Sequence, residues 1–288
     1  MAVERVVVVG GGGLMGSGIA QVVAEAGIHV TIVDVDQSSI DRGMARIERN
    51  LSRSVERERI TGDDKTAAQS RISPSLDLET AGADADHVIE TVIEQIDAKT
   101  EVLRRLDAVC RDDVIFASNT SQFPISQLAA TTNRPDRVVG SHWFNPPPVM
   151  KLIELVRGLE TSDETVQVAV DLAHRYGKET VICKKDTPGF ITSRLIALFM
   201  VEAARIVDEG IADVDDVNKA CMLGFGHAQG PLATADLSGL DTVVRVADSL
   251  RAEYGERFLP PQILRSLVNA GHFGRKTGRG FGDYGDAV

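Results

Sequence analysis

The chain has 288 residues, of which 43% are hydrophobic and 25% charged, the composition of an ordinary globular protein and a length that suits two domains. Its net charge of −11 argues against nucleic acid or an anionic membrane as the main partner, although it does not exclude a small anionic substrate. No apolar run reaches the roughly 18 residues of a membrane span, and the first residues lead into a predicted strand, so neither a membrane segment nor a signal peptide is expected.

The first strong pattern is a β-branched run that ends in a glycine cluster. Residues 6–9 are predicted to form a buried strand, and a helical pattern follows the glycines directly. The spacing matches the dinucleotide fingerprint G-x-G-x-x-G, whose glycines allow a tight turn and close approach of the backbone to a pyrophosphate. The N-terminus of the helix offers its free N–H groups to the phosphates, although a glycine turn without a ligand is an alternative. The residues expected at the cofactor are Gly11, Gly13, Leu14, Met15 and Gly16.

An acidic residue stands where this fingerprint requires one. A second strand-like run covers residues 28–33, and Asp34 follows it directly, 18 residues after Gly16. The fingerprint expects a carboxylate about 20 residues on, where it binds the ribose hydroxyls. Such a carboxylate repels the 2′-phosphate of NADP, and no arginine occurs in residues 35–38. The pattern therefore favours NAD, and an ordinary loop carboxylate is the alternative.

A long helical pattern over residues 38–59 is unusual for a plain dinucleotide-binding fold. Its apolar residues recur every three or four positions and form one stripe: Ile40, Met44, Ile47, Leu51 and Val55. Its arginines form a second stripe with the same spacing: Arg46, Arg49, Arg53 and Arg57. Guanidinium groups suit phosphates, so this face is a candidate binding surface for a phosphate-rich ligand. Interleaved glutamates leave a plain solvated helix as an equal alternative.

Strand and helix patterns alternate through the first two thirds of the chain. The further strands are predicted at residues 71–73, 87–92, 114–118, 138–142, 152–157 and 180–183, with helices between them such as 98–109 and 163–176. This alternation predicts an α/β fold with a Rossmann-type, doubly wound and mostly parallel sheet.

The sequence pattern changes from alternating strands and helices to a run of helices after Pro188 and Gly189. Helices are predicted at residues 191–209, 214–223, 234–254 and 261–270, and the later strand pattern is a short tail at 279–284. We therefore expect a Rossmann-type NAD-binding domain over residues 1–186, with inserted helices at about 38–70, and an all-helical C-terminal domain over 187–288. The helix at 191–209 is apolar nearly all around and must be buried on several sides, which predicts a homodimer.

Polar residues follow the predicted strands near the middle of the chain. The segment Ser118-Asn119-Thr120-Ser121 comes at the carboxyl end of one strand, where ligands bind in such sheets. His142 ends the next strand, and Asn145 follows it. Glu154 lies inside an apolar run, where a carboxylate is costly without a partner. We predict that His142 is this partner, because a carboxylate fixes the tautomer of an imidazole that moves a proton near neutral pH, with a purely structural pair as the alternative.

Cysteine and metal chemistry are not expected. Cys110, Cys183 and Cys221 lie far apart without a CxxC motif, so they are predicted to be reduced thiols in a cytoplasmic protein. The chain has no HExxH motif and no carboxylates with metal-ligand spacing, so we predict no metal. The serine segment lacks a nucleophile elbow, which argues against acyl transfer.

Six segments in one order are the most specific signal in the sequence. They are VVGGGGLMGSGIA at 8–20, VIETVIEQIDAK at 88–99, SNTS at 118–121, HWFNPPPVMKLIELVRG at 142–158, KDTPGFITSRL at 185–195 and GRKTGRGF at 274–281. In these the chain resembles the L-3-hydroxyacyl-CoA dehydrogenases, and within them the bacterial 3-hydroxybutyryl-CoA dehydrogenases, over nearly its whole length. The resemblance implies an oxidoreductase of fatty acid β-oxidation or butanoate metabolism that uses NAD on short-chain (3S)-3-hydroxyacyl-CoA. It also implies that the inserted helices at about 38–70 contact CoA and that the C-terminal domain serves dimerisation and substrate binding.

The resemblance also implies roles for single residues. Ser121, His142, Glu154 and Asn145 match the active-site residues of the family. His142 is expected to take the 3-hydroxyl proton while hydride leaves C3 for the nicotinamide, and Glu154 to orient and stabilise the imidazolium. Ser121 and Asn145 are expected to bind the substrate oxygen and to approach the cofactor.

Further matches concern the cofactor and CoA. Glu94 and Lys99 match residues near the nicotinamide and its ribose, and Lys276 matches a late lysine on the cofactor side. A plain surface pair, and a solvated tail for Lys276, are the alternatives. On the arginine-striped helix, Asn50 and Arg57 stand where the family uses a serine and a lysine for the CoA moiety.

Two positions depart from the family pattern. Ser193 stands at a substrate-binding position that is usually asparagine, and Trp143 replaces the phenylalanine after His142. Because Ser193 is shorter, the substrate carbonyl is held differently or through a water molecule. Both changes bear on which acyl group is preferred.

Two other functions fit the same scaffold. One is a dehydrogenase of a non-CoA 3-hydroxy acid, of the carnitine or gulonate type, and the other is a non-catalytic, crystallin-like NAD-binding protein. Asn50, Arg57 and the arginine stripe favour CoA, whereas the missing asparagine at position 193 weighs mildly against it. The complete set of active-site residues argues against a non-catalytic protein.

Overall fold

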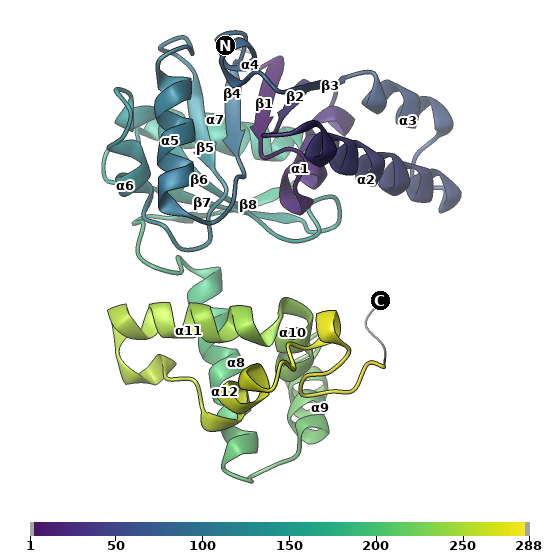
Figure 1. Ribbon diagram of the computed structural model, residues 1–288, viewed down its shortest axis with the longest axis vertical. Coiled ribbons are helices and arrows are strands. Elements are labelled where there is room, and N and C mark those ends of the chain that lie inside the picture. The colour runs from purple at the N-terminus through teal and green to yellow at the C-terminus, as the bar shows by residue number, and fades with distance from the viewer. Residues whose placement is uncertain (1–2, 286–288) are drawn as a thin grey trace. The chain divides into compact units, whose positions relative to one another are not determined.

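The computed structural model describes residues 3–285. The chain divides into two compact units, one up to Phe190 and one from Ile191 on, and each is described by itself (Figure 1). Within residues 3–285, no helix combines the length and the apolar character that crossing a membrane requires.

One sheet of eight strands forms the centre of the first unit, in the order β3-β2-β1-β4-β5-β6-β7-β8 among the described residues. The strands are β1 Arg5–Val9, β2 His29–Val33, β3 Ile72–Ser75, β4 His87–Glu90, β5 Ile115–Ser118, β6 Val138–Trp143, β7 Leu152–Arg157 and β8 Glu179–Cys183. Neighbouring strands run parallel except β6 and β7, which pair antiparallel. The predicted doubly wound, mostly parallel sheet is therefore confirmed.

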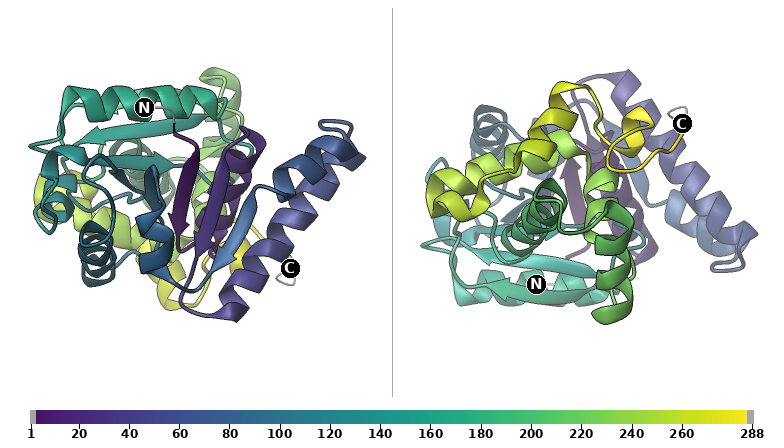
Figure 2. Two further views of the ribbon diagram at one scale, coloured as in Figure 1. Left: turned by 90° about the horizontal axis from the view of Figure 1, so that it is seen from above. Right: turned by 90° about the horizontal axis from the view of Figure 1, so that it is seen from below.

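Helices cover both faces of this sheet (Figures 1 and 2). They are α1 Leu14–Glu25, α2 Gln37–Glu56, α3 Gly62–Gln69, α4 Leu78–Ala83, α5 Ile96–Asp107, α6 Ile125–Ala129 and α7 Asp163–Arg175. Side chains of α1, α2 and α7 share one apolar core with the sheet, and those of α4, α5 and α6 share the other. Strand β1 shows why its apolar run is continuous: Val6 and Val8 enter the first core, and Val7 and Val9 enter the second.

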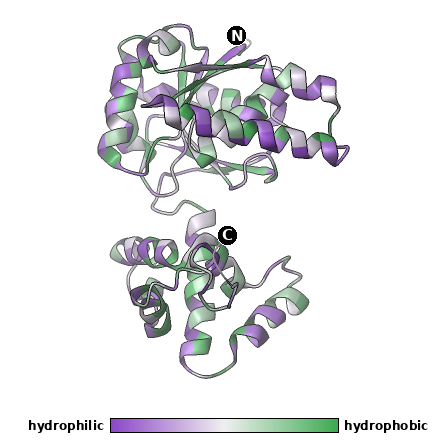
Figure 3. Cartoon of the chain, turned by 45° about the vertical axis from the view of Figure 1, so that its right-hand side comes forward, coloured by the Kyte–Doolittle hydropathy of each residue, from purple (hydrophilic) through white to green (hydrophobic). Residues whose placement is uncertain are grey.

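Helix α2 is amphipathic, as its two stripes predict. Ile40, Ile47 and Leu51 are buried against the first core, whereas polar residues occupy the rest of its surface (Figure 3). The side chain of Asp36 accepts a hydrogen bond of 2.8 Å from the Ser39 N–H and so caps the first turn. The helix ends three residues before the expected end at residue 59, because Glu58 takes a positive φ of 55°.

The second unit is helical, as predicted. Its helices are α8 Thr192–Asp208, α9 Val214–Gly224, α10 Pro231–Ser238, α11 Leu240–Tyr254 and α12 Gln262–Asn269. Residues from all five helices, among them Met200, Val217, Leu232, Val243 and Leu264, form its main apolar core.

Two expectations for this unit are wrong. The single helix expected at residues 234–254 is two helices, α10 and α11, because Gly239 between them has a φ of +90°, which a helix does not allow. The strand expected at residues 279–284 is absent from the described residues. Arg279 instead forms isolated bridges to Gly274 and Asp283, and the buried Asp236 carboxylate accepts hydrogen bonds from the N–H groups of Phe281 and Gly282.

Candidate active site

The glycine turn lies between the carboxyl end of β1 and the N-terminus of α1. The order of strands reverses here, since β2 lies on one side of β1 and β4 on the other, and such a point is where ligands bind in doubly wound sheets. Gly13 is the N-cap residue of α1, and no side chain caps this end of the helix. The first N–H groups of α1 are therefore available to a ligand. This arrangement suits a pyrophosphate.

The glycines of this turn differ in what surrounds them. A Cβ atom on Gly16 lies 2.2 Å from the Gly10 carbonyl oxygen, and one on Gly12 lies 2.3 Å from the Ser39 carbonyl oxygen. A Cβ atom on Gly13 meets only the Gly10 oxygen, at 3.1 Å, and Gly13 is exposed. Gly12 and Gly16 are thus required for packing, whereas Gly13 leaves space for a ligand that approaches the backbone. The residues present therefore fit a dinucleotide.

Asp34 follows β2 beside this turn. Its Oδ2 accepts a hydrogen bond of 2.9 Å from the Gly12 N–H, and its Oδ1 accepts one of 2.8 Å from the Val35 N–H. Asp34, Gly12 and Val35 line a cavity of about 740 Å³ together with Gly10, Gly13 and apolar side chains such as Ile93. The carboxylate predicted for the ribose therefore lies at the predicted phosphate turn.

The first arginine of the stripe belongs to this turn. Arg46 donates hydrogen bonds to the carbonyl oxygens of Gly12 and Gly13 and to the Ser17 hydroxyl, at 3.3, 3.1 and 2.8 Å. It therefore does not share the surroundings of Arg53 and Arg57, and the expectation of one common face for all four arginines is wrong. Arg46 lines the cavity at the glycine turn, whereas Arg53 and Arg57 line another cavity.

His142 and Glu154 face one another across the antiparallel pair of β6 and β7. They are directly opposed in register, and His142 Nδ1 lies 2.9 Å from Glu154 Oε2. The glutamate side chain is fully buried and the histidine side chain is 12% exposed. The ring centroids of Phe144 and Phe190 lie 4.6 and 6.3 Å from the centroid of the imidazole. With Nδ1 turned to the carboxylate, Nε2 is the nitrogen left to exchange a proton with a ligand.

Ser121 and Asn145 come from the loops that follow β5 and β6. The Ser121 N–H donates a hydrogen bond of 3.1 Å to Glu94 Oε1, and Ser121 is partly exposed. Asn145 is exposed, three residues after His142. Both loops leave the carboxyl ends of parallel neighbours in the sheet, the same edge as the glycine turn.

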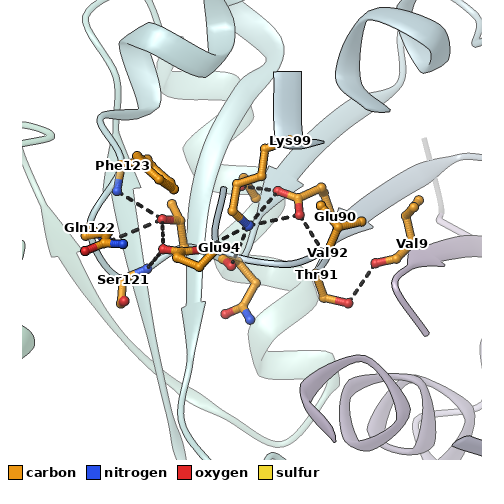
Figure 4. A network of polar contacts seen from close by, with 12 residues as sticks. Val9, Glu90, Thr91, Val92, Glu94, Lys99, Ser121, Gln122 and Phe123 are labelled. Carbon is orange, nitrogen blue, oxygen red and sulfur yellow. Dashed lines mark hydrogen bonds and ion pairs between the residues drawn. The ribbon is translucent and has the colours of Figure 1, made fainter. Parts of the chain in front are cut away.

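Lys99 links Glu94, whose side chain is 32% exposed, to the buried Glu90 (Figure 4). Lys99 Nζ lies 3.1 Å from Glu94 Oε2 and 3.0 Å from Glu90 Oε1, and the side chains of Lys99 and Glu90 are fully buried. Ser118 donates a hydrogen bond of 2.5 Å to Glu90 Oε2. Burial raises the pKa of the Glu90 carboxyl, and the nearby Lys99 ammonium opposes this rise.

Sequence reasoning missed Glu90, although the signal for it was present. Glu90 lies within the apolar segment 87–92, as Glu154 lies within its own apolar strand. The argument that a carboxylate in a buried strand needs a partner applies equally to both. Glu94 and Lys99 do form an ion pair, but the alternative of a surface pair is wrong because the Lys99 side chain is fully buried.

Asn50 and Arg57 lie at a second cavity, separate from the one at the glycine turn. Its volume is about 750 Å³, and Arg53, Arg59 and Arg71 also line it. Asn50 Nδ2 donates a hydrogen bond of 3.2 Å to Gln21 Oε1 of α1. Arg59 and Arg71 lie outside the α2 stripe and were not among the expected residues. A concentration of guanidinium groups here suits a phosphorylated ligand.

The remaining expected site residues lie in the second unit. Ser193 is in the first turn of α8. Lys276 Nζ lies 2.5 Å from Asp241 Oδ1 of α11, with both side chains partly exposed, so the lysine is paired rather than freely solvated.

Other titratable residues show ordinary structural roles. Cys110, Cys183 and Cys221 are buried free thiols. His87 is fully enclosed, and burial lowers its pKa to about 4, so it is neutral at physiological pH.

Comparison with known proteins gives a consistent result over both units. Residues 5–187 match the family profile described as 3-hydroxyacyl-CoA dehydrogenase, NAD binding domain, and residues 189–284 match the one described as 3-hydroxyacyl-CoA dehydrogenase, C-terminal domain.

Individual relatives agree. The chain is 43% identical over 279 residues to a probable 3-hydroxybutyryl-CoA dehydrogenase of Bacillus subtilis, covering 96% of each protein. It is 41% identical over 286 residues to the 3-hydroxybutyryl-CoA dehydrogenase of Mycobacterium tuberculosis, covering 98% of this chain and 99% of that protein. The crystal structure of (S)-3-hydroxybutyryl-CoA dehydrogenase from Ralstonia eutropha is similar with a TM-score of 0.94 at 39% identity, covering 99% of this chain and 100% of that one.

Proposed function

The chain belongs to the 3-hydroxyacyl-CoA dehydrogenase family, and from this premise we propose that it oxidises (3S)-3-hydroxyacyl-CoA to 3-oxoacyl-CoA with NAD, and catalyses the reverse reduction. The observation that carries the mechanism is the 2.9 Å contact between His142 and the fully buried Glu154. The names of the relatives favour a four-carbon acyl group such as 3-hydroxybutyryl.

His142 is the general base of the oxidation. Its Nε2 accepts the proton of the 3-hydroxyl group as the C3–O bond becomes a carbonyl, and the proton returns in the reduction. Glu154 holds the proton on Nδ1 and stabilises the imidazolium, since a buried carboxylate interacts strongly with a positive charge beside it. Ser121 and Asn145 bind the substrate oxygen, and Ser193 is proposed as a further substrate-binding residue.

When bound, NAD would supply the acceptor for the hydride of C3. Gly11, Gly13, Leu14, Met15 and Gly16 would hold its pyrophosphate, and Asp34 would hold the adenosine ribose. Further residues proposed for the nicotinamide side are Glu94, Lys99, Ser121, Asn145 and Lys276. The Gly12 N–H donates a hydrogen bond of 2.9 Å to Asp34 and so holds this carboxylate at the turn. Its negative charge would repel the 2′-phosphate of NADP, which favours NAD.

The proposed reaction is tested by the loss of NADH absorbance with acetoacetyl-CoA. We expect rapid turnover with this substrate and little with free acetoacetate or 3-dehydrocarnitine, and little with NADPH in place of NADH. Equal rates with the free acids would favour a non-CoA dehydrogenase, and binding of NADH without turnover of any of the three would favour a non-catalytic protein.

The second cavity is the proposed site for the phosphates of CoA. Asn50 and Arg57 line it, with Arg53, Arg59 and Arg71 beside them. It lies within the first unit, and Pro146, which follows Asn145, also contributes to its wall. The substrate thioester and the CoA phosphates are thus served by neighbouring segments of the chain.

Removing two of these arginines should weaken CoA binding without harming the chemistry. Arg53→Ala/Arg57→Ala is expected to raise the KM for acetoacetyl-CoA about tenfold, because charged hydrogen bonds to phosphate are lost, and to reduce its dependence on salt. The control is Arg49→Ala, an exposed arginine of α2 that does not line the described cavity. The KM and kcat for acetoacetyl-CoA are measured at two ionic strengths for the double variant and the control. An unchanged KM with a reduced kcat would contradict a CoA site here.

A homodimer through the second unit is part of the proposal. Within the single chain α8 is only partly buried: Ala197, Met200 and Val201 are buried, whereas Leu195 is 65% and Ile196 40% exposed. Other exposed apolar residues of this unit are Ile211, Met222, Leu223, Phe225 and Leu237. Such exposed apolar surface favours association.

The three buried free thiols fit the proposed cytoplasmic location.

Light scattering at micromolar concentration tests the dimer. The unaltered chain is expected to have twice the mass of a monomer, and Leu195→Asp to shift the population to monomers because it places a charge in the apolar contact. A monomeric mass for the unaltered chain would refute the proposal.

A further inference from the structure

The buried Lys178 has no part in the mechanism described so far. It directly precedes β8, and it is only 6% exposed. Burial lowers the pKa of its ammonium group, and the nearby Glu25 carboxylate opposes this fall. A lysine is rarely buried to this extent unless polar partners receive its charge, so the contacts of Lys178 indicate what it does.

Lys178 holds the loop that joins β6 to β7. This proline loop, residues 144–151, contains three successive prolines. Lys178 Nζ donates a hydrogen bond of 2.7 Å to the Pro147 carbonyl oxygen and one of 2.8 Å to the Met150 carbonyl oxygen. Because proline has no N–H group, the prolines cannot donate to a neighbouring strand. The lysine therefore supplies a contact that regular strand pairing does not give this loop.

Helix α1 also holds the proline loop. Pro147 is buried, and a Cβ atom on Gly18 of α1 would lie 2.9 Å from its Cδ and 3.0 Å from its Cγ. The ring of Pro147 thus packs directly against the backbone of α1, at a position that has no side chain. Pro147 is therefore held twice, by Lys178 at its carbonyl group and by α1 at its ring.

The proline loop carries parts of both proposed substrate sites. Asn145, which is proposed to bind the substrate oxygen, is exposed and directly precedes Pro146. Pro146, Pro148 and Val149 line the arginine-rich cavity of about 750 Å³ that is proposed for the CoA phosphates. A shift of this loop therefore displaces Asn145 and the wall of the cavity together.

We propose that Lys178 is a positioning residue, which holds the proline loop so that Asn145 meets the substrate oxygen while the wall of the CoA cavity keeps its shape. The proposal rests on the function proposed for this site. Its physical basis is that proton and hydride transfer require the reacting groups in near-attack geometry, and a displacement of about 1 Å can cost roughly 100-fold in rate.

The test compares Lys178→Met, Asn145→Ala and the double variant in the full chain, by acetoacetyl-CoA reduction at saturating NADH. Lys178→Met removes the donor to the carbonyl groups of Pro147 and Met150 and should lower the Tm by about 5 °C. It should also lower kcat about tenfold and raise the KM for acetoacetyl-CoA about threefold, because Asn145 and the cavity wall lose the same support.

The double variant distinguishes positioning of Asn145 from a general loosening of the protein. If Lys178 acts on kcat through Asn145, the double variant should have nearly the kcat of Asn145→Ala alone. Its KM should still be about threefold above that of Asn145→Ala, because the cavity wall does not depend on the Asn145 side chain. Losses in kcat that multiply in the double variant, or an unchanged kcat in Lys178→Met, would overturn the proposal.

Gly18→Ala displaces the same loop without touching the lysine. The added methyl group presses on the Pro147 ring, but alanine is otherwise favoured over glycine inside a helix, so the Tm should change little. We expect kcat to fall about tenfold, again with little further loss when Asn145→Ala is combined with it. This variant carries the comparison if Lys178→Met does not fold, and an unchanged kcat in it would contradict the proposal.

Two controls separate positioning from loss of charge and loss of stability. Lys184→Met makes the same change at an exposed lysine just after β8 and should alter neither kcat nor Tm. Asp107→Asn breaks a buried ion pair, in which Arg134 Nε lies 2.7 Å from Asp107 Oδ1, and neither residue lines the two cavities described.

Asp107→Asn should lower the Tm but leave kcat unchanged, as loss of a purely structural contact does. A fall in its kcat as large as that of Lys178→Met would show that kcat only follows stability, and would overturn the proposal. If the unaltered enzyme does not reduce acetoacetyl-CoA, the proposed function itself fails instead.

Discussion

Replacing His142 by glutamine is expected to lower kcat about 10²–10⁴-fold, the usual magnitude of general-base catalysis. Glutamine fills similar space and forms hydrogen bonds, but it cannot accept the 3-hydroxyl proton. Glu154→Gln should cost nearly as much, since it removes the charge that stabilises the imidazolium across the 2.9 Å contact. The double variant should be little worse than either single one, because Glu154 cannot support a base that is absent.

Measurements of kcat, NADH affinity and Tm on the three variants distinguish this dyad from a structural pair. NADH binding should survive in all three, since neither residue lies in the glycine turn. His174→Gln is the control, an exposed histidine on α7. Lower Tm values combined with a kcat near that of the unaltered enzyme would show that the pair is structural and would remove the catalytic assignment.

Much of this fold could be predicted because its signals are local. The β-branched run and the glycine cluster lie within 15 residues, and their order alone indicates a strand, a phosphate turn and a helix. Glu154 could also be found from the sequence, because a carboxylate in an apolar strand is costly without a partner. The register that places it opposite His142 then follows from the antiparallel pairing of two strands joined by a short turn.

The parts that escaped prediction depend on contacts between distant segments. Glu90 carries the same signal as Glu154, but it ends its strand, where water can solvate a carboxylate. Only the packing of α5 and β5 over it places Lys99 and Ser118 within hydrogen-bond reach. Likewise the separation of Arg46 from the other arginines of α2 follows from its contact with the glycine turn and not from helical spacing.

The break between α10 and α11 shows a different limit. Apolar residues continue through Gly239 with helical spacing, so periodicity predicts one helix. The chain turns there because Gly239 takes a φ of +90°, which residues with a Cβ atom rarely adopt. A glycine that is required by its backbone angles looks the same in the sequence as one that is merely tolerated.

The two kinds of glycine in the phosphate turn are expected to respond very differently to alanine. Gly16→Ala places a Cβ atom 2.2 Å from the Gly10 carbonyl oxygen and 2.7 Å from the Thr91 hydroxyl, and both contacts are fixed by β1 and the end of β4. The backbone of the turn must therefore move, at a cost of about 1–3 kcal/mol or more. We expect a Tm lower by about 10 °C and loss of NADH binding.

Gly13→Ala separates stability from binding. Its backbone angles, φ −68° and ψ 171°, are open to alanine, and its Cβ atom would meet only the Gly10 oxygen at 3.1 Å. The folded protein should therefore keep its Tm, while the added methyl group occupies the space that a pyrophosphate needs against the backbone and weakens NADH binding at least about tenfold. Gly62→Ala, where a Cβ atom meets nothing within 4 Å, should change neither quantity. Because Gly13→Ala leaves the fold intact, unchanged NADH affinity in this variant would show that the cofactor does not bind at this turn.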